Sequence, residues 1–299
     1  MGPSGTYTEQ ALLSQPDLAA ADTRPVGSIP DVLNAVVEGE VDLAFVPIEN
    51  AIEGAVNVTQ DALAFDLDLL IQREVILDVE LDLLAWPGTA LADIDRVISF
   101  PVALAQCRAF LRENVPDAEV EAATSTADAA RQVAELGPGA AAIANPLAAE
   151  LYGLEALERA IEDHPGNQTR FLLLGREGVP LPTGHDKTSV VVYQRANEPG
   201  SLVMILQEFA ARNIDLNRLE SRPTKHRLGD YCFLFEFEGH IGDEVVADCL
   251  RDLKMKQGDV KFLGSFPAAG QAGEVVRRDR NAKWREADEW TQALRSQIR

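Results

Sequence analysis

Apolar residues recur at helical or two-residue spacing in short segments along the first part of the chain. A helix is predicted over 6–13, because a threonine three positions before a glutamate has the spacing of a capping box. Serine and aspartate at the same spacing predict a second helix over 28–39, closed by a glycine. An apolar strand over 42–46 and a polar loop over 47–50 follow.

The same order of elements returns further along the chain. A capped helix that starts at Ser125 and a strand over 140–144 lead to Asn145-Pro146. Two units of capped helix, short strand and polar loop indicate two similar α/β lobes. The segment 74–86 lies between them and alternates with a two-residue period, which predicts one long strand that crosses from lobe to lobe.

Four polar residues, Asn167 to Arg170, stand directly before an apolar strand over 171–174. Loops at the carboxyl ends of strands are where open α/β sheets bind ligands, and both predicted lobes carry small polar residues there. A cleft between the two lobes is therefore the predicted binding site.

A second domain follows a linker over 178–184 that is rich in Gly and Pro. Strand and helix patterns then occur in the order βαββαβ, which is the order of the ferredoxin-like supersecondary unit. The predicted strands span 188–194, 215–222, 230–238 and 260–266, and the predicted helices span 201–212 and 243–255.

The C-terminal segment after residue 267 is dense in charge but has apolar residues at three- to four-residue steps, at Trp284, Ala287, Trp290, Leu294 and Ile298. An amphipathic helix that docks on a neighbour is consistent with this pattern. A solvated, frayed tail is equally consistent with it.

Composition restricts the expected partners and compartment. The 299 residues carry a formal charge of −21, which repels nucleic acid phosphates and anionic membranes, so neither is an expected partner. No apolar run is long enough to span a bilayer, and the N-terminus has no signal-peptide pattern. The 3 cysteines are widely spaced and odd in number, which favours a reducing, cytoplasmic location, and they form no metal-ligand spacing with the 4 histidines.

Several motifs occur in one order between residues 2 and 267. They are Gly2-Pro-Ser-Gly-Thr-Tyr-Thr-Glu9, Pro47-Ile-Glu-Asn50, Ser99-Phe-Pro-Val-Ala-Leu-Ala-Gln-Cys107, Ser125-Thr-Ala-Asp-Ala-Ala130, Asn167-Gln-Thr-Arg-Phe171, Glu198-Pro-Gly-Ser-Leu202, Glu220-Ser-Arg-Pro223 and Gly239-His-Ile241. By this set the chain resembles the prephenate dehydratases of the monofunctional bacterial type. The resemblance implies an α/β fold with a two-lobed, periplasmic-binding-protein-like catalytic domain over 1–176. A ferredoxin-like ACT regulatory domain over 187–267 and a charged tail over 268–299 would follow it.

Three features depart from the family pattern. The strand that normally leads into the Gly-Pro loop is missing, which predicts a late start or a truncation and an empty sheet position beside the cleft. Phe100-Pro-Val102 stands where many members have His-Pro-Gln. In the effector region, Gly200-Ser-Leu202 replaces the usual Gly-Ala-Leu.

The resemblance implies a carbon–oxygen lyase that converts prephenate into phenylpyruvate in L-phenylalanine biosynthesis. Loss of carbon dioxide and the ring hydroxyl makes the product aromatic, so neither a metal nor an organic cofactor is expected. A protonated carboxylic acid is hard to maintain beside two substrate carboxylates, whereas a neutral hydroxyl avoids that conflict. The resemblance assigns Thr169 to the departing hydroxyl, and it assigns neutral hydrogen bonds around the substrate to Asn50, Ser99 and Gln106.

Five further residues are expected to bind the substrate, namely Thr6, Ser125, Thr126, Arg170 and Phe171. The first three lie at predicted helix N-termini, where capping and anion binding are both expected. Arg170 suits a bidentate contact with a substrate carboxylate, and equally a pairing with Glu49. Cys107 is expected to pack within a helix over 103–111 rather than to act as a nucleophile.

L-Phenylalanine is the effector that the resemblance implies, bound between two ACT domains of a homodimer or homotetramer. The implied effector residues are Pro199, Gly200, Ser201, Leu202, Asn217, Glu220, Ser221 and Arg222. Two alternatives stay open at this point. One is an arogenate dehydratase, whose substrate carries an amino group, and the other is a non-catalytic binding protein that senses amino acids.

Overall fold

The structure is a computed structural model that describes residues 3–194, 198–225, 227–270 and 286–297. It divides into two compact units that each combine segments far apart in sequence. The first unit holds Met1–Ala35, Ala44–Gln60 and Val75–Phe171, and the second holds Val36–Leu43, Asp61–Glu74 and Leu172–Arg299. Within the described ranges, no helix has the length and apolar character needed to cross a membrane.

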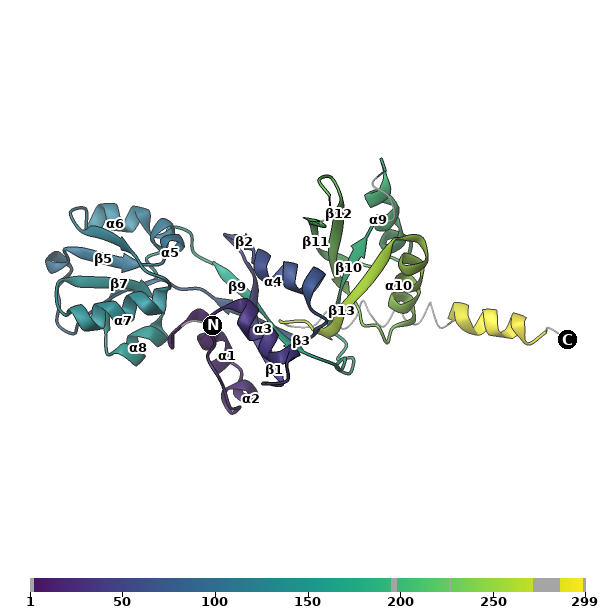
Figure 1. Cartoon of the computed structure of the whole chain (residues 1–299), viewed down its shortest axis with the longest axis horizontal. Helices are drawn as coiled ribbons and strands as arrows, with labels where there is room; N and C mark the ends of the chain where they lie inside the picture. Colours follow the sequence, from purple (N-terminus) through teal and green to yellow (C-terminus); the bar gives the residue numbers. More distant parts are fainter. Residues whose placement is uncertain (1–2, 195–197, 226, 271–285, 298–299) are drawn as a thin grey trace. The chain divides into compact units, whose positions relative to one another are not determined.

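The first lobe is built on a four-stranded sheet in the order β2-β1-β9-β3 (Figure 1). Its strands are β1 Leu43–Asn50, β2 Gly54–Ala55, β3 Leu70–Asp78 and β9 Gln168–Gly175. The accompanying helices are α1 Tyr7–Leu13, α2 Pro16–Ala19, α3 Ile29–Val37, α4 Asn57–Asp61 and the π-helical turn η1 Ala62–Asp66. The predicted caps are confirmed, because Thr6 Oγ1 accepts from Glu9 N and Ser28 Oγ accepts from Asp31 N, both at 3.3 Å.

Two predictions for this sheet were wrong. The segment 47–50 is not a loop, because β1 continues through it and pairs with β2 at Glu49↔Ala55 and Asn50↔Gly54. Strand β9 likewise begins at Gln168, so Thr169 and Arg170 lie inside the strand rather than in a loop before it. In both cases a neighbouring strand supplies hydrogen bonds to polar residues that carry no strand signal of their own.

The segment 74–86 crosses between the sheets as predicted, but as two strands rather than one. Strand β3 ends at Asp78 in the first sheet, and β4, Asp82–Ala85, belongs to the second sheet. Between them, Val79 N donates to Asn167 O and Leu81 O accepts from Ile161 N, both at 2.8 Å. The chain is thus held at the crossing by the segment that returns to the first lobe.

The second lobe contains a five-stranded sheet in the order β6-β5-β7-β4-β8. Its other strands are β5 Arg96–Ser99, β6 Glu119–Ala122, β7 Ala140–Ala144 and β8 Glu155–Glu158. Strands β5, β6 and β7 are parallel, and β4 is antiparallel to β7 and β8. A 3₁₀ turn, η2 Leu91–Asp93, and the helices α5 Pro101–Gln106, α6 Arg108–Asn114, α7 Thr126–Leu136 and α8 Pro146–Tyr152 complete the lobe.

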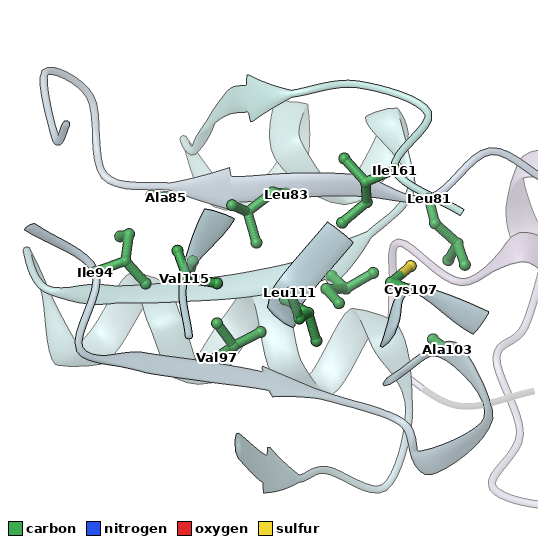
Figure 2. Packing of buried hydrophobic residues seen from close by; sticks show 12 residues of the cluster. Leu81, Leu83, Ala85, Ile94, Val97, Ala103, Cys107, Leu111, Val115 and Ile161 are labelled. Atoms are coloured by element: carbon green, nitrogen blue, oxygen red, sulfur yellow. The ribbon is translucent and has the colours of Figure 1, made fainter. Parts of the chain in front are cut away.

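Helices cover both faces of this sheet, since successive strand residues point to opposite sides. Leu83 packs in a cluster with residues of α5 and α6, whereas Leu84 packs in another with residues of α7 and α8. Figure 2 shows Leu83, Val97 and Leu111 in the first of these clusters. The buried strand β7 has all five of its residues inside, which explains its run of Ala and Ile.

The predicted helix over 103–111 is instead two helices that meet at Cys107, whose φ of −117° and ψ of 19° interrupt the helical backbone. The Cys107 side chain lies in the same apolar cluster (Figure 2). Burial, followed by the nearby charges of Asp163 and Glu162, raises the pKa of its thiol to about 12. The expectation that Cys107 packs in the apolar core is therefore confirmed.

The second domain has the predicted βαββαβ order and an antiparallel sheet ordered β11-β12-β10-β13 (Figure 1). Its elements are β10 Asp186–Tyr193, α9 Ser201–Ala211, β11 Leu216–Pro223, β12 Tyr231–Glu238, α10 Glu244–Lys256 and β13 Asp259–Pro267. Both helices pack on one face of the sheet, where Phe209 contacts Phe235 and Phe237 at ring-centroid distances of 5.1 and 5.0 Å.

The second domain contacts residues 61–74 at three places. Lys187 Nζ lies 2.9 Å from Glu74 Oε1, and Arg222 Nη2 lies 2.6 Å from Asp61 Oδ1. Gly264 stands at a register shift of β13 with a φ of 139°, and a Cβ there would lie 2.7 Å from Ile71 O. A glycine is required where two backbones approach this closely.

Residues 286–295 of the tail are helical. Trp290 is 65% exposed and Leu294 is 45% exposed, so the apolar side of this helix is uncovered in the single chain. Trp284 and Ile298, which belong to the same predicted pattern, lie outside the described residues. The predicted domain boundaries at 176, 187 and 267 stay predictions.

Candidate functional site

Thr169 and Asn50 lie on neighbouring strands of the first sheet, Thr169 near the start of β9 and Asn50 at the end of β1. Asn50 Nδ2 donates to Thr169 Oγ1 at 2.9 Å, and both side chains are partly buried. These residues are 119 positions apart in the sequence, so sheet formation brings them together.

The direction of this hydrogen bond is set by the backbone around Asn50. Asn50 Oδ1 accepts from the N–H groups of Ile52 and Glu53, each at 3.0 Å, which fixes the amide with its Nδ2 toward Thr169. Thr169 Oγ1 is therefore the acceptor, and its own proton makes no hydrogen bond within the described residues. The Thr169 hydroxyl is available as a donor to a ligand.

Gln106 joins the same site from the second lobe. Gln106 Nε2 lies 3.4 Å from Glu53 Oε1, and Gln106 Oε1 accepts from Asn167 Nδ2 at 3.2 Å. Because Glu53 N is bonded to Asn50, one chain of hydrogen bonds connects Thr169, Asn50, Glu53, Gln106 and Asn167. Three of the four predicted catalytic residues thus belong to one network.

Ser99 is placed differently from these three. Its side chain is completely buried at the end of β5, and Ser99 Oγ donates to Ile143 O on β7 at 2.6 Å. This bond ties two strands together and occupies the hydroxyl proton. The predicted catalytic role of Ser99 stays a prediction.

Arg170 and Phe171 follow Thr169 on β9 and are both buried. Arg170 Nη2 lies 3.3 Å from Glu49 Oε2, which corresponds to the second of the two roles expected for this arginine. The Phe171 ring stacks on Phe45 at 5.3 Å between centroids and is 1% exposed. These contacts anchor the strand, and direct substrate contact by either residue stays a prediction.

The predicted helix N-termini are confirmed as caps. Thr6 caps α1, and Ser125 Oγ accepts from Asp128 N at 3.0 Å at the start of α7, where Thr126 is the first helical residue. Among the described residues, none of these three side chains is hydrogen-bonded to the Thr169 network. Their predicted contact with substrate is untested.

Tyr7 of α1 packs against the apolar cluster of the second lobe. Burial, then the charge of Asp82, raises the pKa of the Tyr7 hydroxyl, which donates to Glu80 O at 2.5 Å. Within the described residues, no group of three or more His, Cys, Asp and Glu side chains is arranged to hold a metal ion. The network of Thr169, Asn50, Gln106 and Asn167 offers neutral hydroxyl and amide donors.

The predicted effector residues lie at two places in the second domain. Pro199 is exposed, Gly200 caps α9 with a φ of 89°, Ser201 is buried, and Leu202 packs partly against the domain core. On β11, Asn217 and Ser221 are exposed. Glu220 and Arg222 face the other side, where Glu220 Oε1 accepts from Arg218 at 2.9 Å and Arg222 pairs with Asp61.

Comparison with known families shows to which family the chain belongs. The family model described as prephenate dehydratase matches residues 1–179. The chain belongs to the prephenate dehydratase family. A model of the ACT domain matches residues 188–254, so the predicted α/β fold, with a two-lobed catalytic domain and an ACT domain, is confirmed. Family membership likewise confirms the predicted hydro-lyase activity in phenylalanine biosynthesis.

Two of the similar proteins are prephenate dehydratases, and a third is described as an acylase. A curated prephenate dehydratase of Mycolicibacterium vanbaalenii is 44% identical over 301 residues, which cover 96% of each chain. A prephenate dehydratase of Arthrobacter aurescens, solved in complex with L-Phe, is 40% identical with a TM-score of 0.90 and covers 99% of this chain and 98% of its own. A structure described as a quorum quenching acylase is 31% identical with a TM-score of 0.78 and covers 90% of this chain and 96% of its own.

Sequence reasoning assigned no role to Glu53, and it named Asn167 only as part of the polar cluster 167–170. Glu53 follows Asn50 by three residues, and Asn167 precedes Thr169 by two, so proximity to the motif residues was the available signal. Their role depends on a side chain of the second lobe, Gln106, which no local pattern connects to them.

Proposed function

We propose that the chain converts prephenate into phenylpyruvate, carbon dioxide and water, with the Thr169 hydroxyl as hydrogen-bond donor to the leaving group. One observation carries this assignment. The Asn50 amide donates to Thr169 Oγ1 while its own oxygen is held by two backbone N–H groups, so Thr169 keeps its proton for a ligand.

The chemistry needs what this arrangement supplies. The bond from the ring to its carboxylate breaks, its electrons enter the ring, and the ring carbon–oxygen bond breaks so that the product becomes aromatic. The departing hydroxide is a poor leaving group, so the hydrogen bond donated by Thr169 lowers the cost of its departure, and a proton from solvent then converts it to water. A donated bond from Asn50 also increases the polarity of the Thr169 O–H bond.

Neutral donors suit a substrate with two carboxylates. Gln106 keeps one N–H that makes no hydrogen bond within the described residues, beside the one directed to Glu53. Such groups orient carboxylates without adding a like charge, which a carboxylate in the same position would do. Substrate contacts by Thr6, Ser125, Thr126 and Arg170 are part of this proposal.

We further propose that L-phenylalanine regulates the enzyme through the ACT domain. The support is the ACT match and the complex with L-Phe of the Arthrobacter relative. The effector would bind near Gly200, Ser201 and the exposed face of β11, in a homodimer or homotetramer. A cytoplasmic location, which three free buried cysteines favour, belongs to the same proposal.

Turnover of prephenate by purified protein tests the function, with phenylpyruvate measured by its absorbance in alkali. Thr169→Ala should lower kcat by about two to four decades, the usual size for one acid or donor group. Thr169→Ser keeps the hydroxyl and should lose far less. Equal kcat in wild type and Thr169→Ala would contradict the assigned role.

Arogenate and prephenate are assayed in parallel, because the two substrates differ at one group remote from the leaving hydroxyl. Faster turnover of arogenate would reassign the substrate. Folded protein that turns over neither substrate would favour a binding protein instead. The likeness to an acylase structure makes this direct assay necessary, since one fold can carry different reactions.

A further inference from the structure

Asn167 is a buried polar residue at the point where the chain returns from the second lobe to the first. Its side chain is 3% exposed, and it directly precedes β9, which carries Thr169. Its backbone oxygen accepts from Val79 N, on the segment that leaves the first lobe, at 2.8 Å. The backbone of Asn167 is therefore fixed at the place where both connections between the lobes lie side by side.

The side chain of Asn167 is directed toward Gln106. Its Nδ2 donates to Gln106 Oε1 at 3.2 Å, and Gln106 Nε2 is directed to Glu53 Oε1 at 3.4 Å. A carboxylate accepts hydrogen bonds, so Gln106 must present its Nε2 to Glu53 and its Oε1 to Asn167. Asn167 must in turn direct its Nδ2 toward Gln106 Oε1. The side-chain amides of Gln106 and Asn167 therefore each have only one possible orientation.

This arrangement leaves one polar atom of Asn167 without a hydrogen bond. Its Oδ1 is buried and has no hydrogen-bond partner within the described residues. A buried acceptor without a partner lowers stability, so folding alone does not explain an amide here. An apolar residue of the same shape, such as leucine, would satisfy the core without this cost.

We propose, on the basis of the function proposed above, that Asn167 is a positioning residue that acts through Gln106. Its buried amide fixes the orientation of the Gln106 amide across the two lobes. In that orientation one Gln106 N–H faces Glu53 and the other remains for the substrate. Asn167 thereby keeps the free N–H of Gln106, a donor from the second lobe, correctly oriented relative to Asn50 and Thr169 of the first lobe.

A double-mutant cycle with leucine variants tests this proposal. Asn167→Leu should lower kcat about 10- to 100-fold, the loss that a displaced catalytic group produces, while KM changes by less than about threefold. In a Gln106→Leu background the same substitution should change kcat by less than about twofold, because the group it positions is gone. Full additivity of the two effects, or wild-type kcat in Asn167→Leu, would overturn the proposal.

Stability separates this role from a structural one. The urea midpoint of Asn167→Leu should equal or exceed that of wild type, because the unpartnered Oδ1 is removed. A parallel fall of midpoint and kcat would instead indicate a structural role. Asn114→Leu is the control, since the Asn114 amide is exposed, donates to Phe110 O at 3.0 Å outside the network and should leave kcat unchanged.

A second variant and a second measurement keep the test decisive. Asn167→Asp preserves the shape but presents an acceptor, so the Gln106 amide should turn around and kcat should fall.

The side-chain NH2 signals of Gln106, identified by their loss in Gln106→Leu, report this orientation by NMR without any substrate. They should shift and exchange faster in Asn167→Leu, and unchanged signals would refute the positioning role. Wild-type protein without turnover would refute the proposed function, while the NMR comparison would still decide the role of Asn167.

Discussion

The direction of a single hydrogen bond determines what Thr169 can do. Asn50 Oδ1 accepts hydrogen bonds from the backbone N–H groups of Ile52 and Glu53, and Asn50 Nδ2 donates to Thr169 Oγ1. A side chain with two acceptor oxygens at this position would reverse the bond. The hydroxyl proton of Thr169 would then be donated to the protein rather than to the substrate.

Asn50→Asp therefore should abolish most of the activity with little change in shape. The new carboxylate still accepts from the two backbone N–H groups, but its second oxygen takes the Thr169 proton and adds a charge that repels the substrate. We expect kcat/KM to fall by at least about two decades, as on loss of one donor. The measurement is steady-state kinetics with prephenate, with circular dichroism as a check of folding. Activity within about threefold of wild type would contradict the assigned hydrogen-bond direction.

The identities of Thr169, Asn50 and Gln106 were available from motifs, but their connections were not. Asn50 and Thr169 meet through strand pairing over 119 positions, which no local pattern reports. Ser99 shows the opposite case, because its motif position predicted a substrate contact and the structure gives it a buried bond to Ile143. Motif spacing predicts which residues gather, and packing decides how each one is oriented.

Among the elements, those with local signals were predicted well. The capped helices α1, α3 and α7 and all six elements of the ACT domain fall within a few residues of the predicted ranges. Errors arose where distant partners decide the outcome. Polar residues 47–50 became strand through pairing with β2, and the alternating segment 74–86 divided because its middle bonds to the returning chain.

The strand β10 of the ACT domain carries a buried ionic cluster. Lys187 lies 2.9 Å from Glu74 and 3.5 Å from Glu236, and the two acids have side chains 0% and 6% exposed. Glu74 also accepts from Ala269 N at 2.7 Å. Lys187 thus pairs with two buried carboxylates, and its removal would take an ion pair from each of them.

Lys187→Met should destabilise the protein by about 3–5 kcal/mol, the usual cost of breaking a buried ion pair by removing one of its members. Urea unfolding followed by circular dichroism measures this change. Lys254→Met is the control, because Lys254 pairs with Asp259 at a site where the side chains are 61% and 58% exposed. Its loss should stay below about 1 kcal/mol. Similar midpoints for the two variants would show that the buried cluster contributes no more than a surface pair.

In the molecule as a whole, the catalytic network and the predicted effector residues belong to different domains. The Thr169 network lies in the first compact unit, and Ser201 and Glu220 lie in the second. A regulator that binds the second domain can change activity only through a difference in affinity between two states of the protein. Effector response and basal turnover should therefore be separable by mutation.

Ser201→Ala should change inhibition by L-phenylalanine while basal kcat stays within about twofold of wild type. Ser201 is 7% exposed at the start of α9, so a smaller side chain without a hydroxyl alters the predicted effector site with little effect on the fold. The half-inhibitory concentration should shift by about fivefold or more, the lower range of allosteric coupling. Inhibition curves with prephenate as substrate give both quantities. If Ser201→Ala lost both its basal activity and its inhibition by L-phenylalanine, this result would contradict a separate regulatory site.

The close approach of Gly264 to Ile71 has a consequence for how the ACT domain packs against β3. Its backbone lies so close to Ile71 that one added methyl group would meet the Ile71 carbonyl at 2.7 Å. An alanine at position 264 would push the last ACT strand, β13, away from β3. Strand β3 leads to Val79, which donates to Asn167 O where the chain crosses between the lobes. A hydrogen atom at this one position is thus what allows the last ACT strand to lie directly against Ile71 of β3.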